Sequence, residues 1–379
     1  MAEDPQAAAT ALVSKIVAQP HLTLTEDDAA ILLAAPDRTL MMDKVLTVHF
    51  NRLQDYRKAL PLAQRIQVAE PNSENTKNVA HLMRSAGRVQ DAIRFLEEQR
   101  TLIEPILLAD MLCMMNTSAG NLGEARRQGT ISLTLKDQVG APAPPIQALK
   151  KPFDPKRPRR NVIAFSLWGQ DQRYLDGAVQ NAIVSRHLYP GWSVRVYLDH
   201  SVPGEYQEML RYHGADLRSP PEDWPGPTHG LFWRFLVEDD EDVDYYLIRD
   251  ADSVLNIKER AAVEDWLLSG RSFHVMRDFP SHCELILAGM WGAQRGYLGQ
   301  MRARVDQHIA TTPKRLNHRT TDQEFLRHAI WPIVRQDALV HDESFDFGDT
   351  VPFRKEFALP PNRHIGQNDW VHRRPATKG

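Results

Sequence analysis

The feature of the sequence that most constrains its fold is a spacing of 33 residues that recurs in the first part of the chain. This spacing relates three alanines and the residue five positions before each: Gln54 and Ala59, Gly87 and Ala92, Gly120 and Ala125. Glycine permits a tight turn between two helices, and a small alanine allows the second helix to approach the first. The pattern therefore predicts helix–turn–helix units that stack in an array.

The sequence around these positions has the spacing of amphipathic helices. Residues 1–137 are rich in Ala, Leu, Glu, Gln and Arg, and apolar residues recur every three or four positions. Pro71 and Pro105 follow the first two units, and we expect each proline to close its unit because proline cannot continue a helix. Residues 40–137 resemble tetratricopeptide repeats, with Gln54 in place of one turn glycine and without the consensus tryptophan. A plain helical bundle with a coincidental spacing is the alternative.

A proline-rich, basic segment separates the helical part from the rest of the chain. Six residues are basic and one is acidic between Lys150 and Arg160. A solvated linker explains this segment, and weak contact with an anionic lipid or substrate is the alternative. We therefore expect a helical-repeat domain at 1–137, a linker at 138–160 and a second domain at 161–379.

The second part of the chain alternates between strand and helix patterns. Strand patterns cover Asn161–Leu167, Val194–Leu198, Tyr245–Ile248 and Ser272–Met276, and helical patterns cover Tyr174–Leu188, Tyr206–His213 and Asn256–Leu268. This alternation predicts an α/β domain, in which a mostly parallel sheet carries helices on both faces. Ligands of such sheets bind beyond the carboxyl ends of the strands.

An Asp-x-Asp motif directly follows one of these strands. Asp250 and Asp252 come after the sequence Tyr-Tyr-Leu-Ile-Arg. Two carboxylates can hold Mg²⁺ or Mn²⁺ and leave coordination positions for phosphate oxygens, and the cation makes a diphosphate a better leaving group. An acidic cluster at the start of a helix is the structural alternative. The sequence contains no G-x-G-x-x-G, Walker, H-E-x-x-H or G-x-S-x-G motif, which weighs against dinucleotide enzymes, NTPases, metalloproteases and hydrolases.

An ordered set of motifs in the second part resembles the GT-A-fold glycosyltransferases, and among them the family of glycogenin and the bacterial lipopolysaccharide galactosyltransferases. The matching segments are Ala164–Gly169, Phe232–Phe235, Asp250–Asp252, His274–Asp278, Ala288–Gly289, Thr321–Glu324 and Asn362–Gly366. The resemblance implies a GT-A, Rossmann-like fold. Leu287 departs from it, because this family has an asparagine there that contacts the donor sugar, and Asn368-Asp369-Trp370 replaces a Lys-Pro-Trp sequence.

The resemblance also implies roles for individual residues. Asp250, Asp252 and His364 would hold Mn²⁺ or Mg²⁺, with His341 as the alternative third ligand. The nucleotide-sugar donor would contact Ser166, Leu167, Trp168, Gly169, Asp250, Ala251, Ala288 and Gly289. The catalytic group would comprise Arg234, which neutralises the diphosphate, and Asp322, Gln323 and Asp278, which surround the donor sugar and the acceptor.

Several of these residues also have a structural explanation. Arg234 could pair with the acidic run at 238–244, and Asp278 could cap a strand. Asp322 and Gln323 could form an ordinary helix start, which is compatible with a place in the wall of a site. Trp291 could stack on an acceptor sugar, but a place in the core is the better expectation.

Together the motifs predict a metal-dependent glycosyltransferase that moves a sugar from a nucleoside-diphosphate sugar, a UDP-sugar, to a hydroxyl of a glycan or protein. The resemblance implies retention of the anomeric configuration; an inverting enzyme would need a base, for which Asp322 is the candidate. One alternative is a non-catalytic interaction scaffold with a degenerate transferase domain. Another is a nucleotidyltransferase or phosphatase that uses the same carboxylates.

Composition limits the partners and the compartment. The formal net charge is −3 and gives no reason to expect a nucleic-acid partner. Two cysteines far apart in sequence, Cys113 and Cys283, argue against a disulfide scaffold and favour a cytoplasmic protein, including the inner face of the membrane. No stretch approaches the roughly 20 apolar residues of a transmembrane helix. We expect the helical repeats to bind a protein partner or a second copy, as in a complex for polysaccharide biosynthesis.

Overall fold

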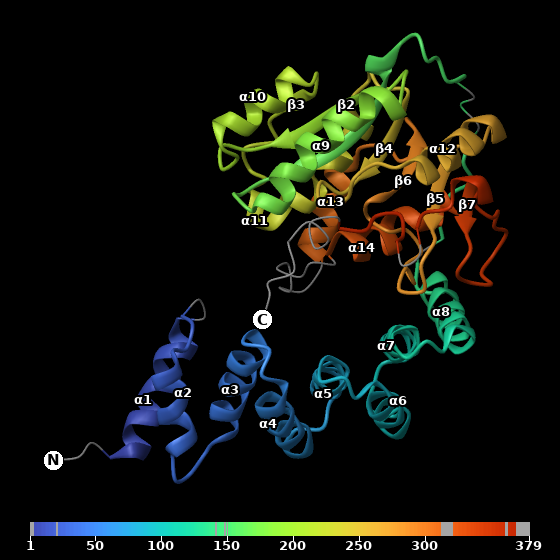
Figure 1. The fold of residues 1–379 in the computed structure, drawn as a ribbon. Coiled ribbons are helices and arrows are strands. Elements are labelled where there is room, and N and C mark those ends of the chain that lie inside the picture. Colours follow the sequence, from blue (N-terminus) through green and yellow to red (C-terminus); the bar gives the residue numbers. More distant parts are fainter. Residues whose placement is uncertain are drawn as a thin grey trace. The chain divides into compact units, whose positions relative to one another are not determined.

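A computed structural model describes residues 4–19, 22–140, 142–147, 149, 151–311, 321–360 and 363–368. The chain divides into two compact units, Met1–Ser132 and Leu133–Gly379, which we call the helical unit and the α/β unit (Figure 1). The division falls inside the last helix of the repeat region, Leu122–Asp137.

The helical unit consists of consecutive helices joined by short turns. These are α1 (Pro5–Ala18), α2 (Glu26–Ala34), α3 (Leu40–Arg52), α4 (Tyr56–Ala69), α5 (Ser73–Ser85), α6 (Val89–Glu98), α7 (Pro105–Ser118) and the start of α8 (Leu122–Asp137). Each helix from α3 to α6 packs on the next one. Helices α2, α3, α4 and α5 begin at side chains that accept a backbone N–H of the first turn, namely Thr25, Thr39, Asp55 and Asn72.

The turns within the helical pairs confirm the repeat. Gln54, Gly87 and Gly120 all adopt left-handed backbone conformations, with φ of 60°, 76° and 77°. The next residue in each turn donates its N–H to a carbonyl five positions earlier: Asp55 to Phe50, Arg88 to Met83 and Asn121 to Asn116, at 2.8–2.9 Å. This is the hydrogen bond of a Schellman cap. Gln54 therefore replaces the glycine without changing the turn.

The repeated alanines lie in the core of the helical unit, whereas one of the two prolines does not have the expected role. Ala59, Ala92 and Ala125 are completely buried. Pro71 lies in the loop between α4 and α5, but Pro105 is the first residue of α7. The expectation that Pro105 closes a unit was wrong, because Pro105 begins the next helix. Proline is well tolerated at the first position of a helix, since the backbone N–H at that position has no partner within the helix.

The α/β unit is built on a seven-stranded mixed sheet. Its strands are β1 (Asn161–Leu167), β2 (Ser193–Leu198), β3 (Asp216–Arg218), β4 (Tyr245–Arg249), β5 (Phe273–Arg277), β6 (Met290–Gln294) and β7 (Ala338–Asp342). They follow the order β3-β2-β1-β4-β6-β5-β7, and every neighbouring pair is parallel except the two that involve β6. The predicted α/β fold with a mostly parallel sheet is confirmed.

Helical segments cover both faces of this sheet. They are α9 (Gln172–Leu188), α10 (Gly204–Tyr212), α11 (Gly226–His229), α12 (Ile257–Ser269), α13 (Met301–Thr311), α14 (Thr321–Phe325), α15 (Trp331–Val334) and the single-turn or irregular segments η1 (Pro158–Arg160), η2 (Gly230–Asp239), η3 (Leu326–Ile330) and η4 (Lys355–Phe357). Ile163, Phe165 and Leu167 of β1 share a core cluster with residues of α9 and α12. Ser166 points to the opposite face, where its hydroxyl accepts the N–H of Arg234 in η2 at 3.0 Å.

The segment before β1 packs on the α/β unit. The Leu149 N–H donates to the Tyr297 hydroxyl at 2.7 Å, and Phe153 joins the core cluster of the sheet. Arg160 forms an ion pair with Asp244, a member of the acidic run. Part of the basic charge of this segment is therefore offset inside the unit.

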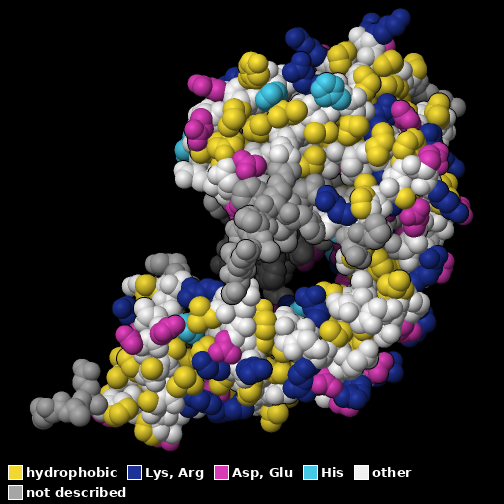
Figure 2. Space-filling view, in the orientation of Figure 1, with side chains coloured by type: hydrophobic (Ala, Val, Ile, Leu, Met, Phe, Trp, Pro, Cys, Tyr) yellow, Lys and Arg dark blue, Asp and Glu magenta, His cyan; other side chains and the backbone are white. Residues whose placement is uncertain are grey.

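Trp291 is completely buried, as expected for a core residue, and its neighbour Tyr246 in the core is buried as well. Figure 2 shows that lysine and arginine side chains are interspersed with acidic ones on the face that it draws, rather than gathered in one basic patch. In the described part of the chain, no helix is both long and apolar enough to cross a membrane.

Candidate active site at the carboxyl edge of the sheet

A cavity of about 600 Å³ lies where β1 and β4 end. Predicted site residues from five separate segments line it: Ser166, Leu167, Trp168, Gly169, Arg234, Asp250, Ala251, Asp252, Ala288, Gly289, Asp322 and Gln323. The carboxyl edge of the parallel strands is where ligands bind in sheets of this kind. Asp278 and His364, which were also predicted, are not among the lining residues.

Close backbone packing positions the Asp-x-Asp loop. A Cβ atom on Gly289 would lie 2.1 Å from an Asp250 carboxylate oxygen, so only glycine leaves room for this carboxylate. A Cβ atom on Gly177, in α9, would likewise lie 2.1 Å from the Ala251 carbonyl oxygen. The loop after β4 is thus pressed against α9 on one side and against the loop before β6 on the other.

The side-chain amide of Asn181 holds the residues that follow Asp252 in this loop. This role of Asn181 was not predicted from the sequence. Asn181 of α9 is completely buried. Its Nδ2 donates to the Ser253 carbonyl at 2.9 Å, and its Oδ1 accepts the Leu255 N–H at 2.9 Å. The available signal was an asparagine on the buried side of an amphipathic helix, where a polar side chain needs partners.

Arg234 joins two of the predicted acids. The residue is buried, and its guanidinium contacts Asp250 and lies 3.1 Å from the Asp322 carboxylate, while it also donates to the Arg249 carbonyl at 2.9 Å. Its ion pairs are therefore with the acids of the site and not with the run at 238–244, so that alternative was wrong. The guanidinium holds the two carboxylates in place at the cavity wall.

Two of the acids at the cavity, Asp252 and Asp322, have raised pKa values. Burial raises the pKa of Asp252 to about 6, the negative charge of Asp250 adds to this effect, and Arg173 opposes it. Burial likewise raises the pKa of Asp322 to about 6 against the opposing charge of Arg234. Such shifts concentrate at functional sites.

The donor set fits a divalent cation. Asp250 and Asp252 offer carboxylate oxygens, which Mg²⁺ and Mn²⁺ prefer, and a cation would offset both the burial of the Asp252 carboxylate and its repulsion by Asp250, the two effects that raise its pKa. The glycine at 289 preserves the space around the Asp250 carboxylate. The structure does not bring His364 into this pair: in the described residues, no group of three potential ligands includes it together with Asp250 and Asp252.

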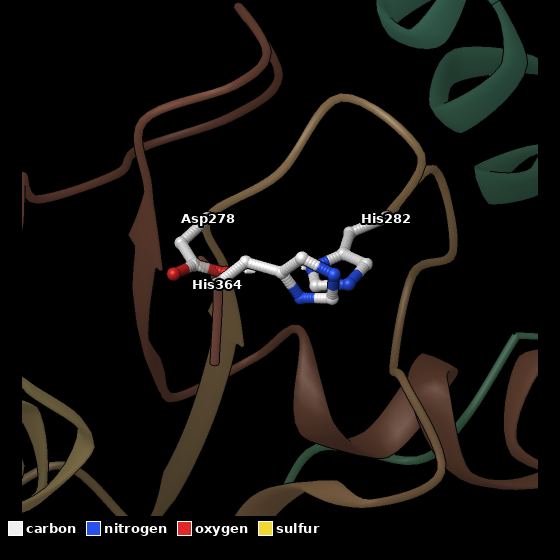
Figure 3. A group of neighbouring side chains, drawn as sticks. All are labelled: Asp278, His282 and His364. Carbon is white, nitrogen blue, oxygen red and sulfur yellow. Dashed lines mark ion pairs between the residues drawn. The ribbon is translucent and has the colours of Figure 1, made fainter. Parts of the chain in front are cut away.

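His364 lies instead beside two other potential ligands, Asp278 and His282 (Figure 3). One ligand atom from each of the three residues lies within 4.8 Å of the others. His282 lines the cavity, but the sequence did not lead us to predict it as a site residue. The available signal was its position four residues after the predicted site residue Asp278. The alternative ligand His341 is buried in β7, where its Nδ1 lies 3.0 Å from Nε2 of His274.

An aromatic and an apolar side chain complete the cavity wall. Trp168 lies against the backbone of Gly230, where an added Cβ atom would approach its ring to 2.5 Å. This contact holds the indole at the edge of the cavity. Leu287 also lines the cavity and presents an apolar surface where the resemblance implies an asparagine.

Comparisons with known proteins give no family for this chain. No protein family and no curated protein matches it. Among solved structures, it is similar to a mutant of the Thermobaculum terrenum O-GlcNAc transferase, with 17% identity and a TM-score of 0.34 over 57% of this chain and 42% of that one. It is also similar to a mutant of MamA, with 18% identity and a TM-score of 0.29 over 35% of this chain and 78% of that one. The chain thus spans less than half of the transferase, and the identities and TM-scores are low, so its function is inferred from the site itself.

Proposed function

We propose that the α/β unit is a metal-dependent glycosyltransferase that moves a sugar from a nucleoside-diphosphate sugar, a UDP-sugar, to a hydroxyl of a glycan or protein. The observation that carries this proposal is the shared cavity. Segments that are far apart in the sequence, and that the family resemblance implies for one site, line the same space. Its volume of about 600 Å³ suits a ligand of nucleotide-sugar size.

Different residues of the cavity would bind different parts of the nucleotide-sugar donor. Trp168 and the end of β1 would receive the base and ribose, for which an aromatic wall is suited. Asp250 and Asp252 would hold Mn²⁺ or Mg²⁺, which offsets the negative charge of the diphosphate leaving group. Arg234 would keep the neighbouring carboxylates in position and add positive charge near the phosphates.

Asp322 is the candidate group for proton transfer. In a retaining enzyme the departing diphosphate can take the acceptor proton, and Asp322 and Gln323 would then orient the sugars. In an inverting enzyme Asp322 would accept the proton from the acceptor hydroxyl. Its pKa of about 6 is low enough for an ionised carboxylate at neutral pH and high enough for a useful base. Asp278 is not part of this group, because it does not line the cavity.

Nucleotide binding gives the first test. A ligand that binds only the folded chain at a hundred times its Kd should raise the melting temperature by roughly 5–10 °C. We expect such a rise with UDP and Mn²⁺ together, and a much smaller one with Asp252→Asn. Asp242→Asn is the matched control, because this side chain is 95% exposed. No rise in the unmodified protein with any nucleoside diphosphate would contradict the proposal.

A non-catalytic interaction scaffold is the alternative that Leu287 favours, because a leucine cannot form the hydrogen bonds of an asparagine to a donor sugar. This alternative predicts no melting-temperature rise with any nucleoside diphosphate and no transfer from any nucleotide sugar. Product analysis with a panel of nucleotide sugars separates the two. The same panel detects a nucleotidyltransferase or phosphatase, which would release other products.

For the helical unit we propose binding of a protein partner or of a second copy of the chain. Stacked helical pairs present extended surfaces suited to such partners. Val48 and Val68 are apolar residues of this unit that are 70% and 83% exposed. Light scattering of the full chain would show self-association, which substitution of both valines by serine should weaken if the unit joins two copies.

A further inference from the structure

We propose a second metal site in the α/β unit, formed by Asp278, His282 and His364, that binds a transition-metal ion of the zinc class. This site does not depend on the proposed transferase function. It uses none of the carboxylates of the Asp-x-Asp loop, and its ligands come from the loop after β5 and from the segment near residue 364 (Figure 3).

The side chains already lie close to coordination distance. Their ligand atoms lie within 4.8 Å of one another, and the two imidazole rings pack edge to face with centroids 4.7 Å apart. Two ligands of a tetrahedral zinc ion, each 2.0–2.1 Å from the metal, are about 3.3 Å apart. Oδ1 of Asp278 and Nδ1 of His282 are separated by 3.5 Å, so this pair already has nearly the separation of two zinc ligands.

Two buried atoms that lack hydrogen bonds of normal length point to a ligand at this position. The Asp278 side chain is 1% exposed. Its Oδ1 and Nδ1 of His282 are both buried, and they form a long ion pair with each other at 3.5 Å rather than hydrogen bonds of normal length. Buried polar atoms of folded proteins are nearly always satisfied, and a shared metal ion would satisfy both at once.

The surrounding groups leave the ligand atoms available. Nδ1 of His364 lies 2.8 Å from the Ile365 carbonyl oxygen, which can only accept, so Nδ1 carries the proton and the lone pair is on Nε2. The Ile365 N–H and Lys258 hold Oδ2 of Asp278 at 2.9 and 3.2 Å, which leaves Oδ1 for the metal. Partners of this kind orient metal ligands in known sites.

The charge and the ligand types of Asp278, His282 and His364 indicate which metal ions this site would prefer. Lys258 lies 3.2 Å from Asp278 and also 3.2 Å from Glu343, so two carboxylates share its positive charge. Two imidazoles and one carboxylate suit Zn²⁺ and similar ions, whereas Mg²⁺ and Ca²⁺ prefer oxygen ligands. Three protein ligands leave a further position for water or for a substrate atom, and His282 places the site at the cavity wall.

Metal binding by the full chain tests this proposal. The protein is stripped with a chelator, dialysed against Zn²⁺ and analysed for bound metal, and Co²⁺ is then used to record visible absorption bands. We expect Asp278→Asn and His282→Ala each to lose one Zn²⁺ equivalent and the Co²⁺ bands. Asp252→Asn should retain both, which separates this site from the Asp-x-Asp pair.

A surface histidine provides the matched control. His187, on α9, is exposed, so His187→Ala should leave the Zn²⁺ content unchanged. Circular dichroism and melting temperature in chelator establish that each variant is folded. If Asp278→Asn does not fold, His282→Ala alone decides. Equal Zn²⁺ content in the unmodified protein and folded His282→Ala, or equal losses in His187→Ala, would overturn the proposal.

Discussion

At the scale of single residues, the chain has several carboxyl groups whose burial disfavours their ionised form. Glu238 is the clearest case outside the candidate site. Its Oε1 accepts the N–H groups of Gly296 and Leu298 at 3.0 and 2.9 Å, and its Oε2 is also buried. Burial raises the pKa of Glu238 to about 7, against the hydrogen bonds that lower it.

The pKa of Glu238 predicts a pH dependence of stability. The folded-state pKa lies above the unfolded one, so the contribution of this residue is greatest below about pH 4.5 and is lost as the pH rises through about 7. Glu238→Gln keeps an oxygen for both N–H groups but carries no charge. We expect it to be more stable than the unmodified protein by roughly 2 kcal/mol at pH 8, with little difference at pH 4.5. Urea unfolding at the two pH values measures this, and an equal difference at both would contradict it.

Gln54 predicts a second residue-scale effect. It occupies a left-handed position, with φ of 60°, that glycine occupies in the other two repeats. Gln54→Gly should therefore stabilise the helical unit by up to about 1 kcal/mol, because it removes backbone strain. The matched change Gly87→Ala should destabilise the helical unit by about 1 kcal/mol, because alanine is strained at a φ of 76°. No atom lies within 4 Å of the added Cβ, so a steric clash does not contribute to this cost. Chemical unfolding of each variant measures both, and equal signs would contradict the repeat interpretation.

At the scale of elements, α9 serves as the support on which the Asp-x-Asp loop rests. Gly177 allows the loop backbone to approach the helix, and Asn181 binds the loop further along. The loop therefore depends on α9 for its position, and changes on the buried side of this helix should affect metal-dependent nucleotide binding as well as stability.

Gly177→Ala tests the contact between α9 and the loop. The added Cβ would meet the Ala251 carbonyl at 2.1 Å, so the helix or the loop must move. We expect a loss of about 2 kcal/mol in stability and weaker binding of UDP with Mn²⁺. Gly204→Ala, at the first residue of α10 where nothing lies within 4 Å, is the control and should leave both quantities nearly unchanged. Unaltered nucleotide binding in a folded Gly177→Ala variant would contradict a supporting role for α9.

Local sequence patterns predicted some elements and missed others for identifiable reasons. β1 and β4 were predicted because they are continuous apolar runs that are buried on both faces. β6 (Met-Trp-Gly-Ala-Gln) was missed, because its glycine and glutamine break the pattern, although it is completely buried between β4 and β5. β3, with three residues, is too short to give a pattern.

The candidate site was predictable where it depends on strand ends and not where it depends on tertiary contacts. Asp250 and Asp252 follow directly from the end of β4, and the structure brings them to the cavity. The neighbours of His364 could not be predicted, because Asp278 and His282 precede it by more than 80 residues and only the fold brings them together. Ion pairs between distant residues, such as Arg234 with Asp322, were missed for the same reason.

At the scale of the whole molecule, the net charge of −3 conceals an acidic run and a basic segment that pair within the α/β unit. Asp240 of the acidic run pairs with Arg195, and Asp244 of the same run pairs with Arg160 of the basic segment. A second feature at this scale is the presence of two kinds of unit in one chain, helical repeats and an α/β unit with the cavity. We propose that the repeats select the partner and that the cavity performs the chemistry.

Sugar transfer at the Asp-x-Asp cavity is tested most directly by measuring transfer with the full chain. The protein is incubated with a panel of nucleotide sugars, Mn²⁺ and candidate acceptors, and the released nucleoside diphosphate and the glycosylated product are quantified together. We expect equal amounts of both with one donor, and loss of more than about 99% of the activity with EDTA or in folded Asp252→Asn, but not in Asp242→Asn. Full activity in Asp252→Asn, or no release from any donor by the unmodified protein, would contradict it.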